Sequence, residues 1–180
     1  RPMTGQIVER LVALGHSRIV TLVPPLWQHP GEDARPELSI REAYQDHGIK
    51  ASRFHLARFE EGKAGLWRTL EGLFSVTPPT AIILPGPQVA LGLFSFCLHH
   101  RIRIPRDLSV ACLNDGPGLY FAKPSIARIE FDTEKFSGAI AREISRLFKR
   151  DETSRPPAVI SSPGRLNPGA SLAPPAKPRR

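Results

Sequence analysis

The sequence predicts an α/β fold built on a doubly wound parallel sheet that is flanked by helices. Short apolar segments, typical of buried strands, alternate along the chain with longer segments whose apolar residues recur at helical spacing. The segments "RIVTLV", "PTAIIL" and "DLSVACL" have no polar face, so we expect helices on both sides of these strands. Right-handed crossovers between such strands produce an open, doubly wound sheet.

The composition fits a folded chain without a membrane span. The 180 residues suffice for one domain or two small lobes, and 41% of them are hydrophobic, which is enough for a core. No apolar run approaches the roughly 18 to 20 residues of a membrane span. The first ten residues lack the apolar segment of a signal peptide. The two cysteines, Cys97 and Cys112, favour a reducing, cytoplasmic setting over a disulfide framework.

Basic residues are concentrated near the C-terminus. The net charge is +8, and seven Lys and Arg residues but only two acidic residues lie between Lys149 and Arg180. Residues 173–180 combine Pro with basic side chains, which predicts a disordered tail. Such a tail can contact nucleic acid or an acidic partner, but we favour the simpler interpretation of a solvated terminus.

Helices and strands are expected to alternate through the first half of the chain. In order, we predict a helix over 4–14, a strand over 18–23, a helix over 37–48, a strand over 51–59 and a helix over 64–74. Thr4 can cap the start of the first helix, and Gly15 and Gly48 can end the first two. A Pro-rich loop over 24–36 follows the first strand.

The second half continues the alternation and then departs from it. We predict strands over 79–84, 107–113 and 126–131, helices over 88–100 and 133–150, and a late strand with a turn in "AVISSPGRL". Thr133 is the expected N-cap of the last helix. That helix has an apolar stripe that includes Phe136, Ile144 and Leu147. Because both faces of the predicted sheet are already covered, this stripe needs a surface outside the sheet.

Four loops follow the carboxyl ends of the predicted strands, where open parallel sheets bind their ligands. They are "PPLWQHPGEDAR", "EEGKAG", "PGPQ" and "NDGPGLYF". Asn114 and Asp115 begin the last loop, and their amide and carboxylate can hold the hydroxyl groups of a small ligand. An Asn-Asp pair also begins ordinary turns, so the spacing alone leaves both interpretations open.

Other chemistry finds little support in the sequence. Cys97 and His100 have the i, i+3 spacing that can hold zinc, but no second pair of ligands has matching spacing, so we predict no metal site. The loop after the first strand is not G-x-G-x-x-G, and neither a nucleophile elbow nor a Ser-His-Asp arrangement is evident. We therefore expect no cofactor and no enzyme, although doubly wound sheets host many activities.

The most distinctive segments are "MTGQIVERLVALGHSRIVTL", "PTAIIL", "VALGLFSFCLHHRIRIPRDLSVACLND" and "KPSIARIEFDTEKFSGAIAREISRLF". In order and spacing they resemble the effector-binding domain of LacI-type transcriptional regulators, whose relatives include periplasmic sugar-binding proteins. The similarity extends to about Leu172. It implies a periplasmic binding protein-like fold, in which two α/β lobes clamp a small, sugar-like effector, in a cytoplasmic and homodimeric regulator.

The resemblance also implies how the chain is divided. Residues 1–125 would form the C-terminal lobe, and 126–150 a strand and helix that return to an N-terminal lobe preceding this sequence. Residues 151–172 would be a linker and a closing strand, and 173–180 a disordered basic tail. The missing lobe would cover the orphan apolar stripe, and a helix-turn-helix that binds operator DNA would lie further upstream. The alternatives are a periplasmic solute-binding protein, which needs a signal peptide upstream, and an α/β enzyme.

The strand-end residues match the family unevenly. The family usually closes the strand predicted over 107–113 with a Gly, an aromatic residue and two Asp residues. The matching residues here are Cys112, Leu113, Asn114 and Asp115. Asn114 therefore replaces the first Asp, and Asp115 keeps the second. Gly86 and Pro87 occupy positions where the family often has Asn-Asp, so that polar contact is replaced.

Two further positions complete the predicted effector site. The family's Arg after the first strand would fall at Pro36, so the neighbouring Arg35 is the candidate that can reach the site. Trp27 lies in the Pro-rich loop and can stack on a sugar face, whereas Trp67 has the helical spacing of a core residue. The predicted effector contacts are thus Trp27, Arg35, Gly86, Pro87, Asn114 and Asp115.

Overall fold

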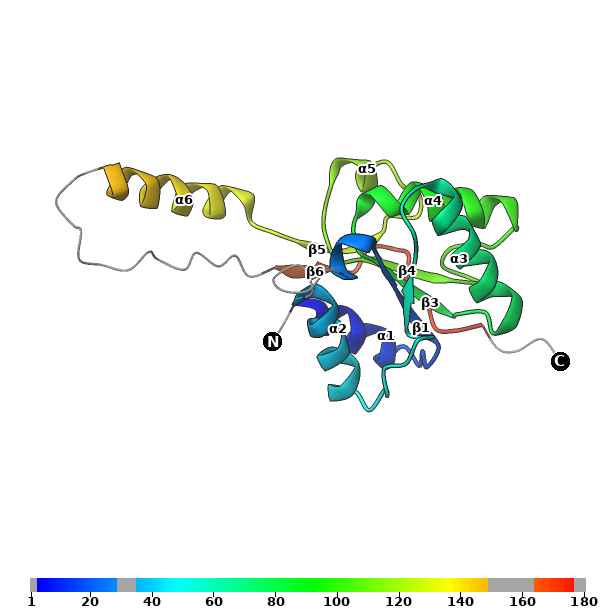
Figure 1. Cartoon of the computed structure of the whole chain (residues 1–180). Coiled ribbons are helices and arrows are strands. Elements are labelled where there is room, and N and C mark those ends of the chain that lie inside the picture. The colour runs from blue at the N-terminus through cyan, green and yellow to red at the C-terminus, as the bar shows by residue number, and fades with distance from the viewer. Residues whose placement is uncertain (1–2, 29–34, 149–163, 177–180) are drawn as a thin grey trace.

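A six-stranded sheet organises the computed structural model, which describes residues 3–28, 35–148 and 164–176 (Figure 1). The strands are β1 (Ile19–Val23), β2 (Leu56–Arg58), β3 (Ala81–Leu84), β4 (Ser109–Cys112), β5 (Ala127–Glu130) and β6 (Arg165–Asn167). Their spatial order is β2-β1-β3-β4-β5-β6, and every neighbouring pair is parallel except β5 with β6. The predicted fold class is therefore confirmed.

Helices cover both faces of this sheet. They are α1 (Met3–Ala13), α2 (Arg35–Asp46), α3 (Lys63–Val76), α4 (Pro87–His99), α5 (Pro117–Tyr120) and α6 (Thr133–Phe148), with a short 3-10 helix η1 at Pro25–Gln28. In Figure 1, α1 and α2 lie below the sheet, and α3, α4 and α5 lie above it. No helix in the described part of the chain is long and apolar enough to cross a membrane.

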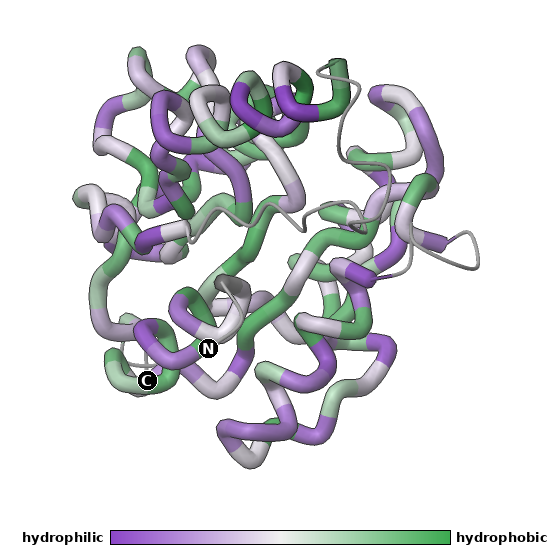
Figure 2. Tube along the Cα trace, turned by 90° about the vertical axis from the view of Figure 1, so that its left-hand side faces the viewer, coloured by the Kyte–Doolittle hydropathy of each residue, from purple (hydrophilic) through white to green (hydrophobic). Residues whose placement is uncertain are grey.

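The central strands β1, β3 and β4 are almost entirely apolar because each of them contributes to two cores. Ile83 packs with α1 and α2, whereas its neighbour Ile82 packs with α3 and α4. In Figure 2 the central strands are accordingly green, while the surrounding helices mix green and purple. A buried polar pair interrupts the first core, where the hydroxyl oxygens of Thr21 and Tyr44 lie 2.9 Å apart.

Glycines end two helices as the sequence predicts. Gly15 has a φ of 92°, and Gly48 has a φ of 72°, a region that is costly for other residues. The amide of His16 donates to the carbonyl of Leu11, and that of Ile49 to the carbonyl of Tyr44. These bonds satisfy carbonyl groups that the helix ends leave free.

Neither predicted N-cap residue has that role, because both Thr4 and Thr133 lie within their helices. Helix α1 already begins at Met3, and the hydroxyl of Thr4 lies 3.4 Å from the carbonyl oxygen of Ser39. The carboxylate of Asp132, rather than Thr133, accepts from the amide of Lys135, 3.0 Å away, at the start of α6. A carboxylate at this place also complements the helix dipole.

Several predicted elements change length. The strand expected over 51–59 is paired only at Leu56–Arg58, because residues 52–55 form a turn in which the amide of Leu56 bonds to the carbonyl of Ser52. The loop expected over 24–36 contains η1, and α2 already starts at Arg35. Residues 29–34 lie outside the described residues. Helix α5, within the loop after β4, was not predicted.

The end of the chain crosses the amino ends of the strands. Ser171 is fully buried, and its hydroxyl oxygen accepts from the amide of Ala127, 2.8 Å away. Ala173 exchanges two hydrogen bonds of 3.0 Å with the hydroxyl of Ser109. Hydrogen bonding thus extends at least to Ala173, the first residue of the predicted disordered tail, while 177–180 lie outside the described residues.

Helix α6 projects from the sheet in Figure 1. None of its residues is buried, and the exposed fractions of Phe136, Ile144 and Leu147 are 39%, 48% and 66%. The apolar stripe therefore has no cover within the described chain. The predicted linker and much of the late strand fall in 149–163, which lies outside the described residues.

Candidate functional site

A hollow of about 560 Å³ lies at the carboxyl ends of β1, β3 and β4. The chain passes from β1 to β2 on one side and reaches β3 on the other, so strand order reverses beside β1. Ligands of open α/β sheets bind at such a switch point. The lining residues are Pro24, Pro25, Leu26, Trp27, Phe59, Glu61, Gly62, Pro85, Gly86, Pro87, Gln88, Val89, Asn114 and Asp115.

The wall beside β1 is apolar and stiff. Pro24 and Pro25 fix their own φ angles and lead into η1, where the amide of Trp27 donates to the carbonyl of Pro24, 3.1 Å away. Trp27 is half-buried, because it packs against the core between the sheet and helices α1 and α2 while also lining the hollow. Phe59 follows β2 and is held by its amide, which donates to the carbonyl of Val23. This wall offers a hydrophobic surface to a ligand.

The wall at the start of α4 consists of backbone and small side chains. Gly86 precedes the helix and Pro87 is its first residue, a position that suits proline because its missing N–H has no helical partner. A Cβ on Gly86 would lie only 2.6 Å from Oε1 of Gln88, so the Gln88 side chain reaches back over this glycine. Gln88 thus brings an amide to the place where Gly86 and Pro87 provide no polar side chain.

The loop after β4 packs closely on this wall. A Cβ on Gly116 would lie 2.7 Å from Cγ of Pro87, so glycine is needed for the approach. Asn114 is exposed, and its Nδ2 donates to the carbonyl oxygen of Pro85, 2.8 Å away. Within the described residues its amide oxygen has no hydrogen-bond partner. Asn114 therefore offers an acceptor to a ligand in the hollow.

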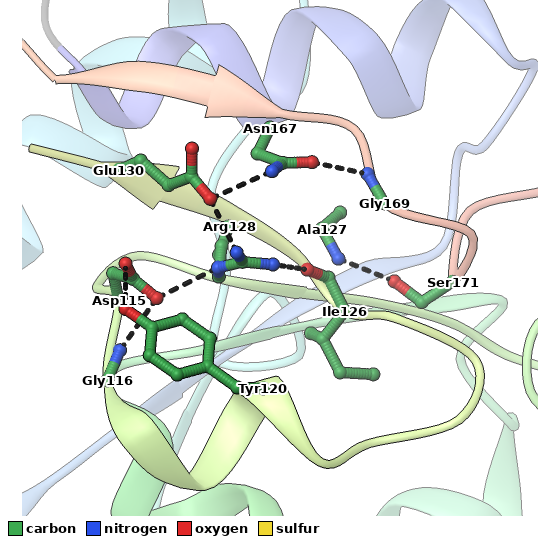
Figure 3. A network of polar contacts seen from close by, with 10 residues as sticks. All are labelled: Asp115, Gly116, Tyr120, Ile126, Ala127, Arg128, Glu130, Asn167, Gly169 and Ser171. Carbon is green, nitrogen blue, oxygen red and sulfur yellow. Dashed lines mark hydrogen bonds and ion pairs between the residues drawn. The ribbon is translucent and has the colours of Figure 1, made fainter.

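Asp115 lines the hollow but its carboxylate is occupied by the protein (Figure 3). Oδ1 accepts from the amide of Gly116 and from Nε of Arg128, both 2.8 Å away. Oδ2 accepts from the hydroxyl of Tyr120, also 2.8 Å away, and this hydrogen bond raises the pKa of Tyr120. Asp115 thus serves first to hold its own loop, and direct ligand contact by its carboxylate remains a prediction.

The hollow brings together five of the six predicted residues: Trp27, Gly86, Pro87, Asn114 and Asp115. Arg35, the first residue of α2, is exposed and is not among the described residues that line it. Trp67 packs edge-on against Phe96, with ring centroids 5.3 Å apart, as expected of a core residue.

Sequence reasoning missed the contribution of Phe59 and Gln88, and the partners of Asp115. Gln88 stands in the strand-end segment "PGPQ", so its position carried a usable signal. Tyr120 stands in the strand-end segment "NDGPGLYF", but only the fold brings Tyr120 and Arg128 to Asp115.

Cys97 and His100, which have a spacing that can hold zinc, take part in packing in the structure. Burial raises the pKa of the Cys97 thiol to about 12, so the thiolate that zinc requires is disfavoured. The ring of His100 packs on Phe96, with centroids 4.3 Å apart. Across residues 3–28, 35–148 and 164–176, no three His, Cys, Asp or Glu side chains cluster in a way that could hold a metal ion.

Comparison with known proteins fits this geometry. The family model of the periplasmic binding protein-like domain matches residues 8–172, and the chain belongs to this family. No curated protein sequence matches it.

Solved structures share the fold at low sequence identity. A LacI family transcriptional regulator from Bifidobacterium animalis subsp. lactis is 23% identical, with a TM-score of 0.79. The superposition covers 97% of this chain and 62% of the regulator's chain. The Escherichia coli transcriptional repressor ascG is 21% identical with a TM-score of 0.75, over 95% of this chain and 61% of its own. The transcriptional regulator CelR, in complex with cellobiose, is 19% identical with a TM-score of 0.76, over 93% and 50%. This chain thus spans half to three fifths of their length.

Proposed function

We propose that this chain is the effector-binding part of a LacI-type transcriptional regulator and that its hollow takes a sugar-like effector. The observation that carries the proposal is the hollow itself, which joins Trp27 and Asn114 at the switch point of the sheet. Membership of the periplasmic binding protein-like family and the fold shared with LacI-family regulators support it. One such regulator is described in complex with cellobiose.

The lining suits a carbohydrate. Sugar rings present an apolar C–H face and a rim of hydroxyl groups, and small-molecule sites meet such ligands with apolar walls and a few placed polar groups. Trp27, Phe59 and the prolines provide the apolar wall. The amide groups of Asn114 and Gln88 can bond to hydroxyl groups, each serving as donor or acceptor.

A second lobe would complete the site. In this proposal residues 1–125 form the C-terminal lobe, and the strand and helix over 126–150 reach an N-terminal lobe encoded upstream. That lobe buries the apolar stripe of α6, which is exposed in this chain. Effector binding then favours the closed arrangement of the lobes, and this population shift changes how an upstream helix-turn-helix binds operator DNA.

A homodimer in the cytoplasm is part of the same proposal. Leu91 and Leu98 lie two turns apart on α4 and are 77% and 82% exposed. Phe121, which follows α5, is 87% exposed, and α5 contacts α4. Exposed apolar side chains of this size suit a protein interface. An exported solute-binding protein would use the same hollow, so the sequence upstream of Arg1 separates the two functions.

Isothermal titration calorimetry of the protein with its upstream lobe present tests the proposal with cellobiose and a panel of neutral mono- and disaccharides. We expect at least one sugar to bind, and Trp27→Ala and Asn114→Ala each to weaken its affinity by about tenfold, or ~1.4 kcal/mol. The matched control Trp67→Phe, which changes a tryptophan of the core, should leave the affinity unchanged. Equal affinities in all three variants would remove the hollow from sugar binding, and a panel without any binder would contradict a sugar effector.

A further inference from the structure

Arg128 on β5 joins the hollow to the far edge of the sheet (Figure 3). Its side chain is only 12% exposed, and each of its three nitrogens has a separate partner. Nε donates to Asp115 over 2.8 Å, Nη1 to the carbonyl oxygen of Ile126 over 3.2 Å, and Nη2 to Glu130 over 2.5 Å. The guanidinium also lies over the ring of Tyr120, 5.3 Å from its centre.

The contacts continue from Glu130 into β6. Oε1 of Glu130 also accepts from Nδ2 of Asn167, 2.8 Å away, and Oδ1 of Asn167 accepts from the amide of Gly169. Strand β6 pairs with β5 in antiparallel register, with Asn167 opposite Arg128. An unbroken series of polar contacts therefore runs from Asp115, at the hollow, to β6.

Strands β5 and β6 lie on either side of α6 in the sequence. β5 leads directly into α6, and β6 is the first element described after 149–163. A displacement of the Asp115 loop would therefore also shift β5 and β6, the two strands that flank α6 in the sequence. Glycine at 169 reinforces the arrangement, because its φ is 51° and an added Cβ would lie 2.5 Å from the carbonyl oxygen of Ser125.

The chemistry of the side chain is specific. A guanidinium places its donors in a rigid planar fork, whereas an ammonium group cannot meet three acceptors in these directions. Two carboxylates, from Asp115 and Glu130, share this one cation. Without it they would face each other's charge in a half-buried setting, so the loop and the strand could not keep their places.

We propose that Arg128 is a positioning residue of the effector site, which fixes the Asp115 carboxylate at the hollow and couples the hollow to β6. The coupling rests on the contacts alone, whereas its use in the response to an effector rests on the proposed function. Changes at the hollow then pass through Asp115, Arg128 and Glu130 to β6.

Hydrogen–deuterium exchange of the ligand-free chain tests the coupling. Asp115→Asn should speed the exchange of backbone amides in 165–167 by about threefold or more, as expected for residues in one network. In an Arg128→Gln background, Asp115→Asn should not raise the exchange rate in 165–167 any further. The matched control is Asp107→Asn, whose carboxylate also pairs with an arginine, Arg103, 2.9 Å away, but in a remote turn. It should leave exchange in 165–167 unaltered.

A gentler change guards against unfolding. Tyr120→Phe removes one hydroxyl from an exposed ring and weakens the same carboxylate, so it decides the question if Asp115→Asn does not fold. Faster exchange confined to 114–121, or an equal rise with and without Arg128, overturns the proposal. Because no ligand is present, such a failure says nothing against sugar binding, and a failure of sugar binding says nothing against the coupling.

Discussion

The side-chain amide of Asn114 donates to the carbonyl oxygen of Pro85, with 2.8 Å between nitrogen and oxygen. This bond ties the loop after β4 to the loop after β3 across the hollow. It also explains the residue type, because an aspartate at this position would place a carboxylate against a carbonyl oxygen with no proton between them. The sequence here has Asn where the family resemblance leads one to expect Asp.

Asn114→Asp should therefore destabilise the fold. We expect the free energy of unfolding to fall by about 1 to 3 kcal/mol, because the carbonyl oxygen of buried Pro85 loses its hydrogen-bond donor. Urea denaturation at neutral pH measures it. Gln88→Glu is the matched control, since it makes the same chemical change on an exposed side chain at the start of α4, where negative charge is tolerated. An Asn114→Asp protein as stable as the parent would show that the bond to Pro85 contributes nothing.

Ser171→Ala should weaken the connection between the C-terminal segment and the sheet. The hydroxyl of Ser171 donates to the carbonyl of Val110 and accepts from the amide of Ala127, and the residue is fully buried. Its loss leaves two buried backbone groups unpaired, which costs about 1 to 3 kcal/mol. Ser75→Ala, on an exposed helical serine, should stay within about 0.5 kcal/mol of the parent in the same urea titration. Equal effects of the two changes would contradict the assigned role.

Stability should decrease as the pH falls from about 7 to 5. The carbonyl of Ala173 can only accept, so Nε2 of His16, 2.8 Å away, carries the proton, and Nδ1 faces the hydroxyl of Thr80. Burial lowers the pKa of His16, and it also lowers the pKa of His55. The unfolded chain, in which histidine titrates near 6.5, therefore takes up protons first as the pH falls, and folding becomes less favourable.

His16→Gln should reduce the slope of unfolding free energy against pH in this window, and a second change, His55→Gln, should reduce it further. Carboxylates with a lowered pKa, such as Asp132, lose their contribution only at pH values near 4 and below, so they leave the window undisturbed. A parent protein with constant stability from pH 7 to 5 would refute this account of His16.

Two isoleucines on helices should differ sharply when shortened. Ile40 on α2 is fully buried in the core, whereas Ile144 on α6 is 48% exposed. Ile40→Ala should cost about 2 to 5 kcal/mol of unfolding free energy. Ile144→Ala should cost less than about 0.5 kcal/mol and reduce the binding of an apolar dye. A large loss of stability on shortening Ile144 would mean that the stripe of α6 is covered in this chain.

The sequence predicts the elements of this fold because their signals are local. Continuous apolar runs such as "AIIL" reflect strands buried on both faces, and Gly15 stands at a position that its positive φ requires. Cap residues failed because a single step in the helix start, from Thr133 to Asp132, is decided by hydrogen bonds that spacing does not record.

The site was predictable only where it follows from strand ends. Asn114 and Gly86 fall in the hollow because the ends of parallel strands meet there. The engagement of Asp115 could not be foreseen, since its partner Arg128 lies on another strand and looks in the sequence like an ordinary surface arginine. Arg35 was placed by its distance along the chain, which does not fix where the start of a helix points.

The central claim is that a small sugar-like ligand binds at the carboxyl ends of β1, β3 and β4. The most direct measurement is the change in backbone amide chemical shifts when the ¹⁵N-labelled protein, with its upstream lobe present, is titrated with the best sugar of the panel. The account predicts that the largest shifts fall at Trp27, Gln88 and Asn114 and at the indole N–H of Trp27. Shifts that gather instead at the separate hollow beside Arg41, Arg53 and Arg58 would contradict it.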